Sequence, residues 1–459
     1  MPLALGLSIY NFLRTHLNTH QHNIAIIGGG CAGLSAAATL TERGYSVTLF
    51  EASSQLGGRA RTVVVENKDL LQLLDNGQHI LLGAYHATLS LLEKAGVKEN
   101  EAFLRLPLQL NMVSSSAKSI FSLKSVNYLP APFNMLVGFI FCKGLSFKDR
   151  ITALTFMRHL QSSNYEIIND KPLVKFLKLH HQSAKLIQML WEPLCLAALN
   201  TPIAKASSKI FLNVLRDSFS GHKKNSDFLI PKLDLSKIIS HPLAHYIQAR
   251  GGSIKLNHRI RTLVEVDNGF NLETRQGTFN FSHVIVATSP ARTDKLLEQL
   301  PKLKTSRDKT DHYQYQPIYT IYLQYPIETK LPQVMCGLSN TISQWVFDRG
   351  ELCGEKGLLA VIVSAEGEHQ KLTQDDLALK VAKELNQAFP QLPKPLWHKV
   401  IAEKRATFSC LPDLARPTNR TAQSNLYLAG DYTYASYPAT IEGAVRSGIY
   451  CANLISNAS

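Results

Sequence analysis

The stretch Asn-Ile-Ala-Ile-Ile-Gly-Gly-Gly-Cys-Ala-Gly, residues 23–33, decides the fold of this chain. Residues 23–27 form a short β-branched apolar run, which is the pattern of a buried parallel strand. The glycines end that strand, and residues 34–43 continue as a helix rich in Ala and Ser. A second strand is expected over residues 45–50. This order of strand, glycine turn, helix and strand predicts an α/β fold with a Rossmann-like domain.

The spacing of the glycines in this turn suits the binding of a pyrophosphate. Gly28 permits the tight turn, Gly30 lets the backbone approach the phosphates, and Gly33 lets helix and strand touch. The first free N–H groups of the helix, that of Ala32 among them, then point at the anion. Glu51 follows Gly33 by 18 residues, the usual distance for a carboxylate that accepts hydrogen bonds from an adenosine ribose.

A second glycine pair follows at Gly57 and Gly58, and it is flanked by Arg59 and Arg61. Two guanidiniums beside paired glycines suit a longer anion that is held along its length, which favours FAD over NAD as the cofactor. The alternative is that the guanidiniums only solvate a loop. That alternative stays open for Arg61, whereas the paired glycines disfavour it for Arg59.

Composition indicates an ordinary globular enzyme. The chain has 459 residues, enough for two or three cores, with 45% hydrophobic and 18% charged residues. Its seven cysteines are scattered singly, without C-x-x-C pairs or metal-ligand spacing. This pattern predicts a reducing, cytoplasmic location and argues against a structural metal site.

The net charge of +14 indicates an anionic partner, and the charge is unevenly distributed. Between Cys142 and Asn225 there are 13 Lys or Arg residues against 5 Asp or Glu residues, beside apolar runs such as 131–142 and 186–199. This combination favours peripheral contact with an anionic membrane, on the inner face of the cytoplasmic membrane, over nucleic-acid binding. A solvated basic face over an ordinary helical core is the equal alternative.

No segment approaches the roughly 20 apolar residues that a membrane-spanning helix needs. Residues 1–13 are mildly apolar, but they have no basic residue before the apolar part and no small-residue cleavage site. We therefore do not expect a signal peptide there. A disordered lead-in and a short interfacial anchor both remain open for this segment.

Polar residues gather inside an apolar run at residues 75–79, Asp-Asn-Gly-Gln-His. Gly77 would let a flat ring approach the backbone, and Gln78 is a further candidate cofactor contact. His79 could donate or relay a proton near neutral pH. The alternative is that His79 is a hydrogen-bonded core residue, which is more common for a single histidine in an apolar run.

The chain is expected to form a nucleotide-binding domain interrupted by a discontinuous α+β substrate domain with a helical cap. Helices are expected over 147–160, with Ser146 as N-cap and Asp149 in the first turn, and over 172–190. A strand near Ile260 is expected beside the adenine. The predicted segments are 21–96, 231–292 and 403–459 for FAD binding, 97–230 for the substrate domain and cap, and 293–402 for the second part of the substrate domain.

The last segment of the chain has the same kind of pattern as the first: a strand that ends in a glycine, followed by the start of a helix. A strand over 425–429 ends in Gly430 and Asp431, and a carboxylate there can reach the ribityl or phosphate end of FAD. Thr440 and Ile441 then open a helix, whose partial positive charge can point at the flavin N1 and O2 atoms. Two ends of the chain that meet around one cofactor are hard to obtain by chance.

Four segments carry a resemblance to a known family: 75–85, 191–195 (Trp-Glu-Pro-Leu-Cys), 403–408 (Glu-Lys-Arg-Ala-Thr-Phe) and 438–448. The chain resembles the FAD-dependent amine oxidase, protoporphyrinogen oxidase and carotenoid desaturase superfamily, and within it the hydroxysqualene dehydroxylase branch. The resemblance implies reductive removal of an allylic hydroxyl from a C30 isoprenoid to give squalene in hopanoid biosynthesis. Because only one dinucleotide motif is present, the electrons must come from an external donor.

In that reaction hydroxide is a poor leaving group, so a positioned acid or hydrogen-bond donor must assist its departure. His79 is the first candidate for this catalytic role, and Glu192, if buried and protonated, is the second.

Three alternatives are weighed against this function. By the same resemblance, amine oxidases carry an aromatic residue and a lysine where this chain has Thr440 and Thr320, which argues against an amine substrate. A carotenoid or phytoene desaturase is harder to exclude, because its substrate is equally apolar. A non-catalytic lipid carrier that retains flavin is disfavoured, because the cofactor motifs are complete.

Overall fold

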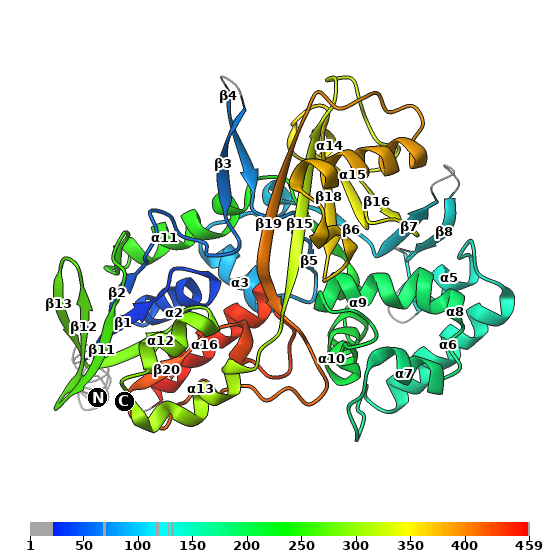
Figure 1. Ribbon diagram of the computed structural model, residues 1–459. Coiled ribbons are helices and arrows are strands. Elements are labelled where there is room, and N and C mark those ends of the chain that lie inside the picture. The colour runs from blue at the N-terminus through cyan, green and yellow to red at the C-terminus, as the bar shows by residue number, and fades with distance from the viewer. Residues whose placement is uncertain (1–21, 68–69, 115–118, 127, 130–132, 458–459) are drawn as a thin grey trace, which may run out of the picture.

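The structure is a computed structural model that describes residues 22–67, 70–114, 119–126, 128–129 and 133–457. The segment 1–13, for which an interfacial anchor was left open, lies outside the described residues. The expected α/β architecture is present: a parallel sheet, a larger mixed sheet and a group of helices occupy three regions of the molecule (Figure 1).

The parallel sheet is built from segments far apart in the sequence. Its central strand, β1 (Asn23–Ile27), lies between β2 (Ser46–Phe50) and β14 (His283–Val286), and all pairings are parallel. The edge strands are β10 (Ser253–Lys255) and β20 (Leu426–Leu428). Four residues of β1 are fully or almost fully buried, as expected for a strand covered on both faces.

Two helices from opposite ends of the chain pack on each other beside this sheet. α2 (Cys31–Glu42) follows β1 directly, and α16 (Ile441–Ser456) ends the described chain; they lie side by side in Figure 1. A Cβ on Gly448 of α16 would lie 2.1 Å from the carbonyl oxygen of Ala32. A glycine at this position therefore allows the two helices to approach closely. α11 (His241–Gln248) also packs against α2.

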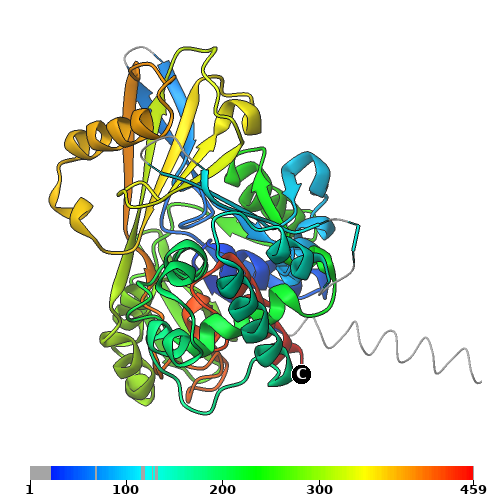
Figure 2. The same cartoon turned by 90° about the vertical axis from the view of Figure 1, so that its right-hand side faces the viewer.

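The mixed sheet has seven strands in the order β19-β15-β18-β17-β16-β7-β8. Along β15 (Tyr315–Gln324) alternate residues face opposite sides. Tyr322 packs with the apolar cluster that includes the helical region, and Ile321 packs with α15 (Gln374–Ala388). Figure 2 shows α15 covering the outer face of the sheet. The other strands are β19 (Trp397–Phe408), β18 (Leu358–Ser364), β17 (Trp345–Asp348), β16 (Met335–Leu338), β7 (Gln109–Val113) and β8 (Ser119–Lys124).

Helices between β8 and β9 form a separate group on the inner side of this sheet, at the right in Figure 1. Ser146 and Asp149 form the capping box of α6, which confirms the predicted start of that helix. The group comprises α5 (Phe133–Ile140), α6 (Phe147–Ser162), α7 (Leu173–Leu179), α8 (Ala184–Leu186), the π-helical turn Ile187–Trp191, α9 (Glu192–Leu199) and α10 (Ser208–Phe219).

The single helix expected over 172–190 is wrong. His181 adopts a left-handed conformation with φ of 55°, which ends α7, and Ser183 caps a new helix by accepting from the N–H of Leu186. A π-helical turn then precedes Pro193. Because Pro193 has no N–H, the carbonyl four residues earlier would have no hydrogen-bond partner in a regular α-helix. The backbone forms the wider π-helical turn at this point.

Smaller elements complete the described chain. The hairpin strands β3 (Thr62–Asn67) and β4 (Leu70–Asp75) lead to the polar segment 75–79. The division into domains at residues 96, 230, 292 and 402 stays a prediction. The remaining elements include β5 (Leu81–Leu82), β6 (Phe103–Leu106), β9 (Phe228–Pro231), β11 (Thr262–Val266), β12 (Gly269–Thr274), β13 (Gly277–Phe281), α3 (His86–Lys94), α4 (Glu99–Ala102), α12 (Pro290–Leu297), α13 (Lys304–Asp311) and α14 (Arg349–Cys353).

Candidate functional site

The turn from β1 to α2 leaves the start of the helix open for an anion. Gly30 is the N-cap of α2; no side chain caps the helix there, and its first turn contains no acidic residue. A Cβ on Gly30 would meet only the Cα of Gly58, at 4.0 Å, whereas one on Gly33 would lie 1.9 Å from the carbonyl oxygen of Gly28. Gly28 itself has φ of 113°. The free N–H groups of a helix start, Ala32 included, with space above Gly30, fit a pyrophosphate.

Glu51 is held rigidly at the end of β2. One carboxylate oxygen accepts from the N–H of Gly29 at 2.7 Å and the other from the N–H of Ser53 at 2.8 Å. Each carboxylate oxygen has a further lone pair for a ligand hydroxyl. Ile260, two residues before the start of β11, is buried in the same apolar cluster as Phe50. This arrangement is compatible with the predicted ribose and adenine contacts.

The second glycine pair packs directly on the first glycine turn. Gly57 forms a bridge with Gly30, and its N–H donates to the carbonyl of Gly29 at 2.8 Å. A Cβ on Gly58 would lie 3.2 Å from the Cα of Gly30. The structure therefore brings the two predicted motifs together, and it does so by contact between backbones.

Arg59 extends from this junction to the last segment of the chain. Its guanidinium donates to the carboxylate of Asp431 at 2.6 Å and to the carbonyl of Ala406 at 2.5 Å. Asp431 is 5% exposed. Arg61 behaves differently, because its Nε atom is buried without a hydrogen-bond partner among the described residues.

The start of α16 has the form expected from the sequence. Thr440 is the N-cap and accepts from the N–H of Gly443 at 3.1 Å, and Ile441 is the first helical residue. Gly430 precedes Asp431 in extended backbone, and its N–H donates to the hydroxyl of Ser447 at 2.9 Å. Together these contacts fix the loop between β20 and α16 against the helix.

The segment after β4 fixes the tautomer of His79 and favours its neutral form. Its Nδ1 atom lies 2.7 Å from the carbonyl oxygen of Gly77, and because a carbonyl can only accept, Nδ1 carries the hydrogen. Burial lowers the pKa of His79, which favours the neutral ring. Its Nε2 atom is then an acceptor at neutral pH. The neighbouring Gln78 accepts from Arg349 at 2.9 Å.

Glu192 stands at the junction of the π-helical turn and α9. Its carboxyl forms no hydrogen bond or ion pair with any residue in the described part of the chain, and burial raises its pKa. A carboxyl group in this state keeps its proton to higher pH than usual. Of the two predicted catalytic residues, Glu192 therefore has the properties of an acid and His79 those of an acceptor.

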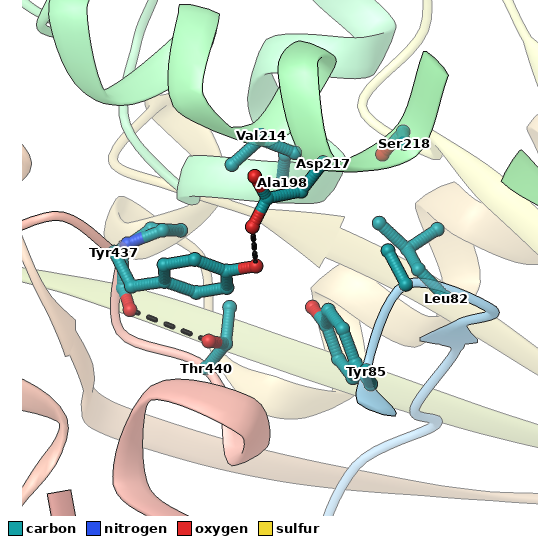
Figure 3. A pocket seen from close by; sticks show the side chains of 10 residues that line it. Leu82, Tyr85, Ala198, Val214, Asp217, Ser218, Tyr437 and Thr440 are labelled. Atoms are coloured by element: carbon teal, nitrogen blue, oxygen red, sulfur yellow. Dashed lines mark hydrogen bonds between the residues drawn. The ribbon is translucent and has the colours of Figure 1, made fainter. Parts of the chain in front are cut away.

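A small cavity at the start of α16 contains polar groups that the sequence did not single out. Leu82, Ala84, Ala198, Val214 and Pro438 give it an apolar lining. Figure 3 shows the polar groups that converge there: Tyr85, Asp217, Ser218, Tyr437 and Thr440.

The Tyr437 hydroxyl donates to the carboxylate of Asp217, which belongs to α10 (Figure 3). Burial raises the pKa of both Tyr85 and Tyr437, so the two phenols stay protonated. Asp217 and Ala84 also line a surface hollow of about 340 Å³. Asp217 therefore lies between bulk solvent and the phenol of Tyr437.

Charged groups behind this cavity are paired with one another. The guanidinium of Arg446 donates to Glu442 at 2.7 Å and lies 4.0 Å from Asp217. Glu442 is fully buried and accepts from the N–H of Thr88 at 2.9 Å, at the start of α3. In the sequence, the only signal for this site is that Tyr85 and Tyr437 border two motifs; the pairing with Asp217 spans 220 residues.

The sequence pattern of the family described as flavin containing amine oxidoreductases matches residues 31–456. The chain belongs to this family. As a member of it, the protein is an oxidoreductase with FAD as cofactor, in agreement with the fit of the glycine turns to a pyrophosphate.

Several known proteins are similar to this flavoprotein over nearly its whole length. The hydroxysqualene dehydroxylase of Zymomonas mobilis is 28% identical over 441 residues, covering 94% of this chain and 98% of the relative. The zeta-carotene desaturase of Synechocystis is 24% identical over 482 residues, covering 94% and 96%. Among solved structures, an oxidoreductase from Methanosarcina mazei superposes with a TM-score of 0.71 at 18% identity, covering 95% and 100%, which confirms the fold.

Proposed function

We propose that this flavoprotein removes the hydroxyl group of an allylic C30 alcohol reductively, converting hydroxysqualene to squalene and water. The observation that supports this function is a cavity of about 10 Å³ at the start of α16, large enough for a hydroxyl group, where the phenols of Tyr85 and Tyr437 and the carboxylate of Asp217 meet. The similarity to hydroxysqualene dehydroxylases over nearly the whole chain supports it independently.

This cavity favours an alcohol over a hydrocarbon substrate. The cavity, of about 10 Å³, has room for one hydroxyl-sized group, so we propose that it receives only the hydroxyl end of the substrate. A buried hydroxyl needs hydrogen-bond partners, since leaving it unpaired costs about 1 to 3 kcal/mol. Tyr437 donates its own hydrogen to Asp217, so its phenol oxygen can accept the hydrogen of a bound hydroxyl. The phenol of Tyr85, which its raised pKa keeps protonated, lines the same cavity. A carotene offers no polar atom to these groups.

The chain's own residues have three tasks in this reaction. The glycine turns, Glu51 and the Arg59–Asp431 pair hold FAD, which in its reduced form supplies the hydride. An acid must protonate the departing hydroxyl so that it leaves as water, and Glu192 is our first candidate because burial raises the pKa of its carboxyl. His79 is neutral, and its Nε2 atom has no hydrogen-bond partner among the residues that the structure describes, so its proposed role is to orient a donor group by accepting from it, not to deliver the proton.

The substrate and the electrons come from outside the protein. An isoprenoid of this size partitions into lipid, so we propose that the protein works in peripheral contact with an anionic membrane. None of the described helices is both long and apolar enough to cross a bilayer. FAD must be reduced by an external donor.

The test is an anaerobic incubation of the reduced holoprotein with hydroxysqualene, followed by mass analysis of the lipids. We expect squalene to form in step with flavin oxidation. The same protein with oxidised FAD and phytoene tests the desaturase alternative. Desaturation of phytoene without dehydroxylation would overturn the proposal, and turnover of neither substrate by FAD-loaded protein would favour a lipid carrier.

A further inference from the structure

The helical group ends in an apolar edge that no described residue covers. We define the α5–α6 edge as Phe133, Leu136 and Ile140 of α5, Phe141 of the following turn, and Phe147 and Ile151 of α6. These six side chains are 55%, 38%, 47%, 76%, 77% and 46% exposed, in that order. Contiguous exposed patches of large apolar side chains mark interaction surfaces. In Figure 1, α5 and α6 lie at the right, on the other side of the molecule from the parallel sheet.

The α5 helix cannot turn this apolar face inward. Its opposite face is packed, with Asn134, Gly138 and Phe139 buried. A Cβ on Gly138 would lie 2.7 Å from the carbonyl oxygen of Lys124, so the helix backbone lies directly on the end of β8. The side chains at positions 133, 136 and 140 therefore share the outward face.

The turn between α5 and α6 is fixed by hydrogen bonds. The N–H of Lys143 donates to the carbonyl of Ser122 at 2.9 Å, and the N–H of Ser122 returns a bond at 3.2 Å. Arg150 donates to the carbonyl of Ile140 at 2.5 Å and to that of Leu145 at 3.3 Å. Phe141 and Phe147 therefore lie at the two ends of a turn that these hydrogen bonds hold in place.

The charge around the edge is positive. Lys124, Lys143 and Lys148 are exposed and form no ion pair with any residue among those the structure describes. Asp149 is the single acidic residue between Ser119 and Tyr165. Its carboxylate is already used, because it accepts from the hydroxyl groups of Ser146 and Ser183 at 2.7 Å each.

We propose that the α5–α6 edge docks on the headgroup region of an anionic bilayer, with Phe141 and Phe147 inserted and the three lysines against the lipid phosphates. Large apolar side chains beside unpaired lysines match both the acyl boundary and the charge of such a surface. A protein partner is disfavoured, because it would have to place acidic groups opposite the lysines inside an otherwise apolar interface. The inference rests on the membrane contact in the proposed function, for which it names the surface, and a vesicle-binding assay tests it separately from the reaction.

Cosedimentation of the holoprotein with vesicles tests this docking. We expect binding to vesicles of phosphatidylglycerol and phosphatidylcholine and much weaker binding to phosphatidylcholine alone. The pair K143Q/K148Q should weaken binding about thirtyfold at low salt, since each lysine near an anionic surface contributes roughly 1 kcal/mol. The pair F141S/F147S should weaken it at least tenfold at any salt concentration.

The matched control is L379S/K380Q on α15, which removes one exposed leucine and one exposed lysine from another face. It should bind vesicles like the natural chain. Flavin absorbance and melting temperature show whether each variant is folded and loaded. The docking is overturned if the natural chain ignores anionic vesicles, if the edge variants bind as tightly as the control, or if those variants change the oligomeric state because a second copy covers the edge.

Discussion

The guanidinium of Arg59 lies 2.6 Å from the carboxylate of Asp431, although 372 residues separate the two in the chain. Arg59 follows the second glycine pair, and Asp431 begins the loop after β20. The pair therefore joins the two segments that were expected to grip FAD from opposite ends of the sequence. A negatively charged cofactor placed here would meet a guanidinium whose position is set by a buried carboxylate.

Removal of either partner should weaken FAD binding. Arg59→Gln leaves the buried Asp431 carboxylate unpaired, and Asp431→Asn frees the guanidinium, so we expect each to raise the Kd for FAD about tenfold or more. The double variant should lose less than the two singles combined. Flavin fluorescence titration measures this, with Arg43→Gln as control, because Arg43 bonds to Asn453 at the far end of α2. Equal FAD affinity in all variants would contradict the predicted role.

Tyr437 should distinguish an alcohol from a hydrocarbon. Tyr437→Phe removes the phenol oxygen, which can accept from a bound hydroxyl, and keeps the shape of the ring, so we expect affinity for a C30 allylic alcohol to fall about tenfold while affinity for squalene is unchanged. Asp217→Asn should have a smaller effect of the same sign. Perturbation of the flavin absorbance on ligand addition reports both affinities. Tyr450→Phe, at a residue that is 49% exposed on α16, is the control.

The pH profile should report Glu192. Because burial raises the pKa of this carboxyl and its protonated form is the one that donates, activity should fall as pH rises through the raised pKa. Glu192→Gln should lower the rate by about 100-fold or more and remove this limb of the profile. Rates of flavin oxidation by substrate, followed between pH 5 and about 9, give the test. Glu166→Gln, at an exposed position, should keep the natural profile.

The titration of Asp75 should stabilise the folded protein more in mild acid than at neutral pH. Burial raises its pKa from 3.8 to about 6, so the folded protein binds a proton more tightly than the unfolded chain. The resulting stabilisation is complete below pH 3.8 and is lost as pH rises through about 6. It amounts to about 3 kcal/mol.

Asp75→Asn keeps an oxygen that can accept from the N–H of Leu235 and removes this titration. The difference in unfolding free energy between Asp75→Asn and the natural chain should therefore change between pH 4 and about 7, in favour of the variant at the higher pH. Urea unfolding at three pH values measures the difference. A constant difference across this range would contradict the assigned pKa.

Local signals in the sequence predicted elements correctly both in the parallel sheet and in the helical group. The apolar run at residues 23–27, the glycines after it and the N-cap at Ser146 each act through contacts within a few residues, and each is found as expected. The predicted helix over 172–190 failed because the effect of His181 and Pro193 on the backbone was overlooked. A left-handed residue and a proline without N–H both interrupt helical hydrogen bonding.

The substrate side of the site could not be predicted from local patterns. Asp217 stands in a basic, amphipathic helix where a carboxylate usually faces solvent, and only folding brings it to Tyr437. The directions of the pKa shifts of His79 and Glu192 also depend on burial, which cannot be read from a single sequence. Motifs thus indicated a candidate cofactor site, whereas the polar groups of the cavity at the start of α16 were found only from the three-dimensional contacts.

The position of β20 at the edge of the parallel sheet has a consequence for biosynthesis. β1 is synthesised well before β20, Asp431 and α16, which form the second of the two segments predicted to hold FAD. A nascent chain that stalls before Leu426 lacks this second segment. We therefore expect such a chain not to retain flavin, so cofactor capture would follow the synthesis of both segments.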